Sequence, residues 1–156
     1  MKKCSVVLSV LCLMLFAVNC SKKPENYVEL VRGGYLQEYK TTTIGKAFDA
    51  SFDNPQWKAF ETDKGVIIVE FNGSTSQKTH ENACRLVLAE HAGVMPESEF
   101  RELMDSGKLD AMWTPGVPAT VQFTIGLDRE SFEISHINSP AWSLMEADDV
   151  LTVIYH

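Results

Sequence analysis

The 156-residue sequence lacks the motifs by which many enzyme classes are recognised. No serine stands in a Gly-x-Ser-x-Gly elbow, and no glycine-rich loop of the kind that cradles phosphate is present. Basic residues are also scarce, because 14 Lys and Arg stand against 21 Asp and Glu, for a net charge of −7. An acidic surface is a poor partner for nucleic acid or anionic lipid. We therefore expect no enzymatic activity, no cofactor and no nucleic-acid partner.

Charge is absent from the beginning of the chain after Lys2 and Lys3. Residues 4–21 carry no charged side chain, and their centre reads VVLSVLCLMLFAV. Two basic residues followed by an apolar run are typical of a secretory signal peptide. An uncleaved membrane anchor is an alternative, because 18 uncharged residues reach the lower end of the roughly 17–25 that span a bilayer. A cleaved signal without lipid is another.

The end of this run resembles a bacterial lipoprotein signal. It reads AVNC and ends at Cys20, with alanine where leucine is usual and asparagine where a small residue is usual. The resemblance implies that residues 1–19 are removed, that Cys20 is acylated and becomes the first residue, and that residues 20–26 form a lipidated tether. Ser21 after the lipidated cysteine implies the outer membrane, on its periplasmic side. Two or three acyl chains would anchor the protein to the membrane essentially permanently.

Cysteine is scarce in the part that would remain. Residues 1–19 contain two lysines and no acidic residue, so their removal changes the net charge from −7 to −9 and leaves 137 residues. That length suits one domain with a real core, which we place at residues 27–156. Cys84 would be the one cysteine without lipid, so no intramolecular disulfide is expected. Burial of this thiol is favoured over reactivity.

Periodicity predicts the elements of the first half of the domain. Residues 27–36 alternate enough for a strand. A short amphipathic helix follows Thr43 as N-cap and should stop at Asp53-Asn54-Pro55. Residues 57–62 and 66–71, joined by a tight Asp-Lys-Gly turn, then indicate a hairpin.

The second half begins with helical periodicity and returns to strands. Residues 77–107 indicate a helical insertion, and residues 118–138 give the clearest hairpin of the chain. Ser139-Pro140 then suits the start of a last helix, which we expect to give way to an extended tail at residues 151–156. The predicted fold is therefore α+β: an antiparallel sheet of four to five strands with helices on one face and a helical insertion between two hairpins.

Two blocks of the sequence resemble a family of small bacterial lipoproteins and secreted proteins without an assigned activity. They read TTIGKAFDASFDNPQWKAFETDKGVIIVEFNG and VQFTIGLDRESFEISHI. The matching positions are Thr43-Ile44-Gly45, Phe52, Pro55-x-Trp57, Val69-Glu70-Phe71 and Gln122-Phe123. These are packing residues, so the resemblance carries over no catalytic role. A more distant resemblance is to β-lactamase-inhibitor-like domains, which include small outer-membrane assembly lipoproteins.

One helical segment carries residues that could ligate a metal. His80, Cys84 and His91 lie at positions i, i+4 and i+11, so they fall close to one face of a helix. A thiolate and two imidazoles suit zinc or copper. An ordinary amphipathic helix with a buried thiol explains the same pattern.

Trp113 is a second candidate, for binding rather than for catalysis. The surrounding residues, DAMWTPGVP, are typical of a loop, and an exposed aromatic on a loop is a common binding anchor. Packing over the edge of the sheet is the alternative.

Two hypotheses of function follow. The first is a lipid-anchored, non-enzymatic domain that binds, assembles or inhibits an unknown envelope protein, and the second is a periplasmic carrier of a ligand or metal.

Overall fold

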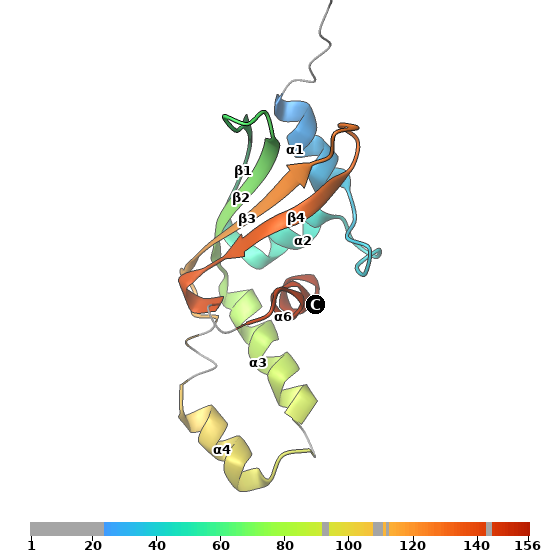
Figure 1. Cartoon of the computed structure of the whole chain (residues 1–156). Coiled ribbons are helices and arrows are strands. Elements are labelled where there is room, and N and C mark those ends of the chain that lie inside the picture. Colours follow the sequence, from blue (N-terminus) through green and yellow to red (C-terminus); the bar gives the residue numbers. More distant parts are fainter. Residues whose placement is uncertain (1–23, 92–93, 108–110, 112, 143–144) are drawn as a thin grey trace, which may run out of the picture.

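The computed structural model describes residues 24–91, 94–107, 111, 113–142 and 145–156. The described chain forms one four-stranded antiparallel sheet in the order β1-β2-β3-β4, accompanied by five α-helices, which confirms the predicted α+β class (Figure 1). The elements in chain order are α1 (Pro24–Gly33), α2 (Ile44–Ser51), β1 (Phe52–Glu61), β2 (Ile67–Thr75), α3 (Gln77–His91), α4 (Glu97–Asp105), β3 (Pro118–Ile125), β4 (Phe132–Asn138), a 3₁₀ turn (Pro140–Trp142) and α6 (Ala147–Tyr155).

The sheet is a meander whose two hairpins were both predicted from alternation. β1 pairs with β2 and β3 pairs with β4, while the central pair β2–β3 joins the two hairpins. Helices α3 and α4 lie between β2 and β3 in the sequence, so the helical insertion between hairpins is confirmed. In space this insertion extends away from the sheet, and α4 is its outermost part (Figure 1).

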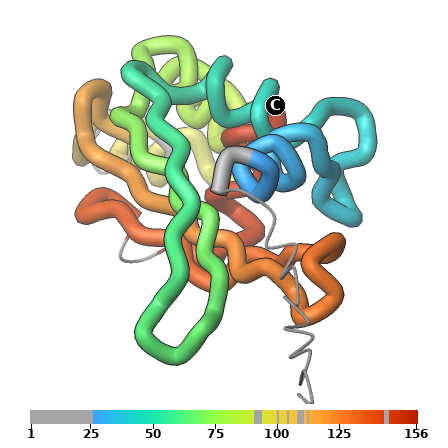
Figure 2. Tube along the Cα trace, turned by 90° about the horizontal axis from the view of Figure 1, so that it is seen from above, coloured from blue at the N-terminus to red at the C-terminus, as the bar shows by residue number. Residues whose placement is uncertain are grey.

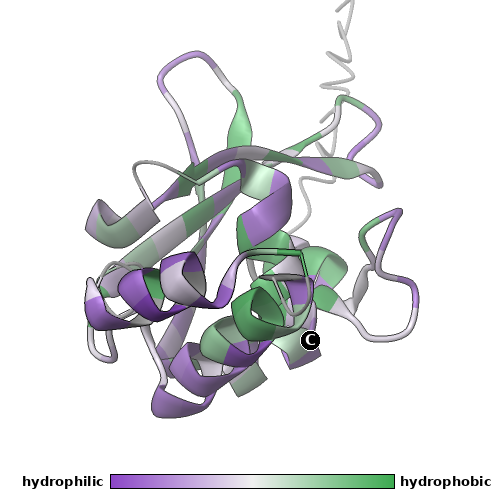
Figure 3. Ribbon diagram, turned by 90° about the horizontal axis from the view of Figure 1, so that it is seen from below, coloured by the Kyte–Doolittle hydropathy of each residue, from purple (hydrophilic) through white to green (hydrophobic). Residues whose placement is uncertain are grey.

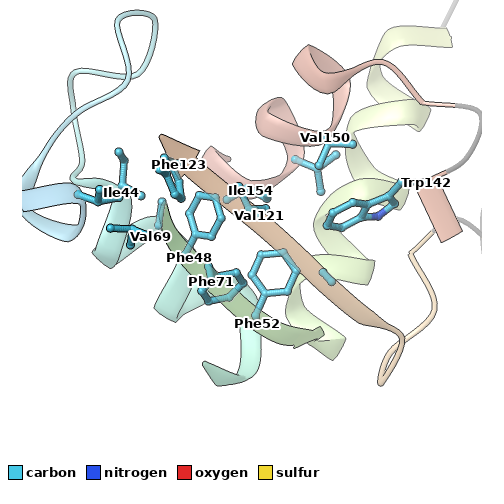
Figure 4. Packing of buried hydrophobic residues seen from close by; sticks show 14 of the residues in the cluster. Ile44, Phe48, Phe52, Val69, Phe71, Val121, Phe123, Trp142, Val150 and Ile154 are labelled. Atoms are coloured by element: carbon cyan, nitrogen blue, oxygen red, sulfur yellow. The ribbon is translucent and has the colours of Figure 1, made fainter. Parts of the chain in front are cut away.

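One face of the sheet carries the core. Successive strand residues point to opposite faces, so Val69 and Phe71 on β2 meet Val121 and Phe123 on β3 on the same side. Phe48 of α2 packs edge-on against Phe71, with ring centroids 4.9 Å apart. Figure 4 shows these rings converging with residues from α6. The other residues of the buried cluster are Tyr27, Val31, Ile44, Ala47, Phe52, Ala83, Trp113, Ala119, Ile125, Trp142, Val150, Val153 and Ile154.

Helix α2 begins as predicted and ends differently. The Thr43 hydroxyl oxygen accepts a hydrogen bond from the Lys46 amide at 3.4 Å, as an N-cap does. The helix ends at Ser51, however, and β1 starts at the next residue instead of after a loop at Asp53-Asn54-Pro55. Asn54 has a positive φ of 52°, and the pairing register shifts there, which marks a bulge. Pro55 has no N–H to donate to a neighbouring strand, and it is tolerated in β1 because this strand lies at the edge of the sheet.

The prediction of a strand at residues 27–36 is wrong, because α1 occupies residues 24–33. Pro24 suits the first turn of a helix, where its missing N–H costs no hydrogen bond. Tyr27 and Val31, four residues apart, are both buried in the core. Over ten residues the same apolar positions fit both a strand and a helix. Burial of Tyr27 and Val31 together is possible on one side of a helix, and it favours the helix. Residues 24–26, which the sequence predicts as part of a tether at 20–26, belong to α1.

The end of the chain also differs from the prediction. Ser139-Pro140 opens only a short 3₁₀ turn, and the segment expected as an extended tail is the second half of α6. Val150, Leu151, Val153 and Ile154 are buried there, so packing outweighs the weak strand preference of β-branched residues. Figure 3 shows the helix at the marked C-terminus as mostly hydrophobic.

The two ends of the molecule carry different elements. The N-terminal end of α1 and the turns of both hairpins lie at one end, and α4 lies at the other (Figure 1). Viewed from above, the two turns lie on the same side of the start of α1 (Figure 2). Across residues 24–156, as far as they are described, no helix has the length and apolar character needed to cross a membrane.

Candidate binding surface

The face of the sheet that points away from the core carries an ordered row of polar side chains. Strand pairing places Lys58 opposite Glu70, Glu70 opposite Gln122, and Gln122 opposite His136. The row therefore crosses all four strands. We call this surface the polar sheet face, formed by Lys58, Glu70, Asn72, Thr120, Gln122 and His136.

Glu70 is the centre of the row. Its Oε1 accepts hydrogen bonds from Lys58 Nζ at 2.7 Å and from Asn72 Nδ2 at 2.8 Å. Its Oε2 accepts one from Gln122 Nε2 at 2.6 Å. The carboxylate thus bonds groups from three strands. The Glu70 side chain is only 12% exposed, whereas that of Lys58 is 62% exposed.

These bonds determine the protonation state of Glu70. Partial burial alone would raise the pKa of this carboxyl, but the hydrogen bonds from Lys58, Asn72 and Gln122, together with the charge of Lys58, outweigh it and lower the pKa to about 2. Glu70 is therefore ionised at neutral pH and cannot serve as a general acid there. Its role in this geometry is to hold the surrounding donors in place.

A second row continues the network on the same face. Asn72 lies opposite Thr120, and the Thr120 hydroxyl donates to Asn72 Oδ1 at 2.7 Å. Each amide is therefore oriented by a neighbour. The result is a surface of amides and hydroxyls around one ion pair, which can exchange hydrogen bonds with a polar partner.

Two of the three predicted metal ligands lie close together. His80 Nε2 is 3.8 Å from Cys84 Sγ, and His80 Nδ1 is 3.2 Å from the carbonyl oxygen of Trp113. A carbonyl can only accept, so Nδ1 donates the proton when the imidazole is neutral, and Nε2 presents its lone pair. Cys84 is half-buried rather than fully buried. Metal-binding histidines commonly donate their second ring N–H to a carbonyl in this manner.

The third predicted ligand does not complete a site that can be described. His91 ends α3, but its side chain lies outside the described residues. Within the described part of the chain, no group of three or more His, Cys, Asp or Glu side chains could hold a metal ion. A zinc ion normally takes four ligands, so the metal site stays a prediction.

Trp113 is not an exposed loop anchor. Its side chain is 2% exposed and packs against Trp142, with ring centroids 5.2 Å apart. Burial of the large apolar ring is the reason, since the loop folds back onto the domain core. The alternative of packing is therefore the observed one.

A cleft of about 300 Å³ opens between α3 and α6 beside Trp113. Apolar side chains form most of its lining, and two carboxylates, Glu90 and Asp149, come from the two helices. Its size is at the lower end of the range of small-molecule sites. The residues that line it are Leu86, Val87, Glu90, Trp113, Met145, Asp149, Thr152 and Val153.

The predicted lipidation site, Cys20, and the signal segment 1–19 lie outside the described residues.

Comparison with known proteins gives no match: no family model, curated protein or solved structure is significantly similar to the chain. The resemblance to small envelope lipoproteins therefore stays a prediction.

The sequence predicts which strand residues point to solvent, but not which of them lie next to each other on the polar sheet face. Glu70 and Gln122 stand between apolar residues in VIIVEFNG and VQFTI, which places them on the solvent side of their strands. Alternation does not give the strand order or register, so the contact between these two residues is visible only in the structure.

Proposed function

We propose that this protein is a lipid-anchored, non-enzymatic binding protein of the bacterial envelope. In this proposal Cys20 carries the acyl chains, the domain faces the periplasm from the outer membrane, and the polar sheet face binds an envelope protein that it assembles or inhibits. The single observation that supports binding at this place is the hydrogen-bonded row around Glu70.

The geometry of this row favours binding over catalysis. Three donors are held on one carboxylate, so their side chains lose little further freedom when a partner binds. The low pKa of Glu70 keeps that carboxylate charged throughout the neutral range. A fixed set of hydrogen-bonding groups contributes specificity, because a partner without matching groups would leave them unpaired.

The anchor is tested by Cys20→Ser in the full-length chain. The unchanged chain should incorporate a labelled fatty acid and sediment with membranes, and the variant should do neither. Persistent membrane association of the variant would contradict lipidation and indicate an uncleaved membrane anchor.

Binding is tested by a photo-crosslinking amino acid placed at either exposed end of the row, Lys58 or His136. Matched controls place it at Glu29 on α1 and Glu99 on α4, which are also exposed. Irradiation of cells should give a discrete crosslinked protein from the two row positions and not from the controls. The same product from all four positions, or none from the row, would contradict the proposal.

A carrier function is the second candidate, favoured by the cleft between α3 and α6 and by the His80–Cys84 contact. Zinc titration of the unchanged protein against Cys84→Ser tests the metal form of this function. A weaker affinity in the variant would support it, and an unchanged affinity would remove this helix as the site.

A further inference from the structure

We propose that the turns of both hairpins rest on the lipid bilayer, with Leu127 inserted among the headgroups. The proposal rests on the lipid anchor at Cys20 proposed above and adds an orientation to it. The surface concerned consists of the β1–β2 turn (residues 62–66) and the β3–β4 turn (residues 126–131), and we call it the turn end.

The length of chain before α1 limits how far the domain can stand from the membrane. Helix α1 begins at Pro24, so only Ser21, Lys22 and Lys23 separate it from Cys20. Four Cα steps of at most about 3.6 Å give a reach of about 14 Å. The N-terminal end of α1 therefore stays close to the headgroups of any bilayer that holds the acyl chains.

The turn end lies at the same end of the molecule as the start of α1 (Figures 1 and 2). The helical insertion extends in the opposite direction (Figure 1). A domain held at the start of α1 can therefore bring both turns to the bilayer, with α4 pointing away from it.

The turn end exposes large apolar side chains to solvent. Leu127 is 105% exposed, the highest value among the exposed large hydrophobic residues of the described chain, and Val66 on the other turn is also exposed. Between the turns lies a groove of about 390 Å³, lined by both residues and by Lys64 and Arg129. Apolar groups flanked by cations match the boundary between acyl chains and phosphates.

The β3–β4 turn is held in the conformation that displays Leu127. Asp128 Oδ1 accepts hydrogen bonds from the Glu130 amide at 3.0 Å, the Ser131 amide at 2.9 Å and the Ser131 hydroxyl at 2.8 Å. The Gly126 amide also donates to the Ser131 carbonyl oxygen at 2.9 Å. The turn is thus ordered before it meets any partner, so docking costs little conformational entropy.

Charge determines which lipid suits this surface. Residues 62–66 carry one acidic and one basic residue, and residues 126–131 carry two acidic residues and one basic residue. The turn end is therefore close to neutral, unlike the acidic chain as a whole. A zwitterionic phospholipid surface fits it, and a strongly anionic one does not.

The test uses the full-length lipidated protein in phosphatidylethanolamine and phosphatidylcholine vesicles that contain nitroxide-labelled lipid. Cys84→Ala leaves one reactive thiol for an environment-sensitive fluorophore, placed by Asp63→Cys in the β1–β2 turn or by Glu99→Cys on α4. We expect severalfold stronger quenching and a blue-shifted emission at position 63. Equal quenching at the two positions would overturn the proposal.

A second substitution tests the role of Leu127 without labelling it. Leu127→Asp should reduce quenching of the probe at position 63 severalfold, whereas Val94→Asp, at an 82% exposed apolar residue of the helical insertion, should leave it unchanged. Equal responses to the two substitutions would overturn the role of Leu127. The mass of the N-terminal peptide is measured on the same sample. Acylation with an unquenched probe refutes the orientation alone, and absence of acylation refutes anchor and orientation together.

Discussion

The two faces of the sheet differ although the same strands build them. Along β2, Val69 and Phe71 point into the core while Glu70 between them points to solvent, and β3 repeats the pattern with Val121, Gln122 and Phe123. The covered face is packed with aromatic rings, and the polar face is ordered by hydrogen bonds.

The difference indicates how stability and binding are divided in this domain. Burial of large apolar side chains contributes most of the folding free energy, and most of it lies on the face that carries the core, while Ile68 is the buried apolar residue on the polar side of β2. Hydrogen bonds on a solvent-facing surface contribute less, because water competes for the same groups. Substitutions on the polar face can therefore change binding while the domain stays folded, and the predictions below test this division.

The largest effect is expected on the covered face. Phe71→Ala removes a fully buried ring in contact with Phe48, Phe52 and Trp57, and should lower the free energy of unfolding by about 3–5 kcal/mol. Urea denaturation measures it. The matched control is Glu133→Gln, an exposed residue of β4, with an expected change within about 0.5 kcal/mol. A comparable loss of unfolding free energy in both variants would contradict the view that the covered face, and not the polar face, carries most of the stability.

A smaller loss is expected from adding one methyl group to the covered face. A Cβ on Gly73 would lie 2.8 Å from Cζ of Phe71 and 2.9 Å from Cβ of Phe52, so both must move. Gly73→Ala should therefore cost about 1–3 kcal/mol by overpacking. Thermal unfolding checks this, and an unchanged melting temperature would show that the aromatic cluster can adjust.

A pH-dependent effect is expected on the polar face. The pKa of Glu70 is about 2 in the folded protein, below the ordinary value of 4.5, so its ionised form stabilises the fold above about pH 4.5 and this contribution is lost as the pH falls towards 2. Glu70→Gln should cost on the order of 1–2 kcal/mol at neutral pH, with solvent exposure of Lys58 taken into account. Urea denaturation across this range should show the difference between the two proteins shrinking on acidification. A constant difference would argue against the ion pair as its source.

The smallest effect is expected in the helical insertion. Arg101 pairs with Glu97 one turn away on α4 at 2.8 Å, and both side chains are largely exposed. Arg101→Ala should cost no more than about 0.5 kcal/mol, as exposed helical pairs do. A larger loss, measured by urea denaturation, would show that α4 is coupled to the sheet more closely than its exposure indicates.

Sequence reasoning recovered the parts of the fold that depend on local periodicity. The hairpins, α2 with its Thr43 cap and the insertion all follow from spacing and turn residues. It failed where tertiary burial outweighs local preference. Tyr27 and Val31 bury one side of α1, and α6 is helical although three of its four buried residues are β-branched. Whether these two segments form helices or strands depends on the sheet that they cover.

The candidate site was recovered in part. The contact between His80 and Cys84 follows from i, i+4 spacing, whereas burial of Trp113 depends on a loop closing over the core. The row around Glu70 could not be assembled from sequence, because strand register places Lys58 and Gln122 beside it. Register depends on the whole sheet, and a shift of one residue would turn these side chains to the other face.

The most direct test of the central claim separates binding from folding on the polar face. With the photo-crosslinking residue at His136, the chain carries Gln122→Arg in the middle of the row or, as control, Glu99→Arg on α4. We expect Gln122→Arg to lower the yield of the crosslinked protein severalfold while the melting temperature changes by only a few degrees, and we expect the control to retain the yield. An undiminished yield in Gln122→Arg, or an equal fall in the control, would contradict binding by this face.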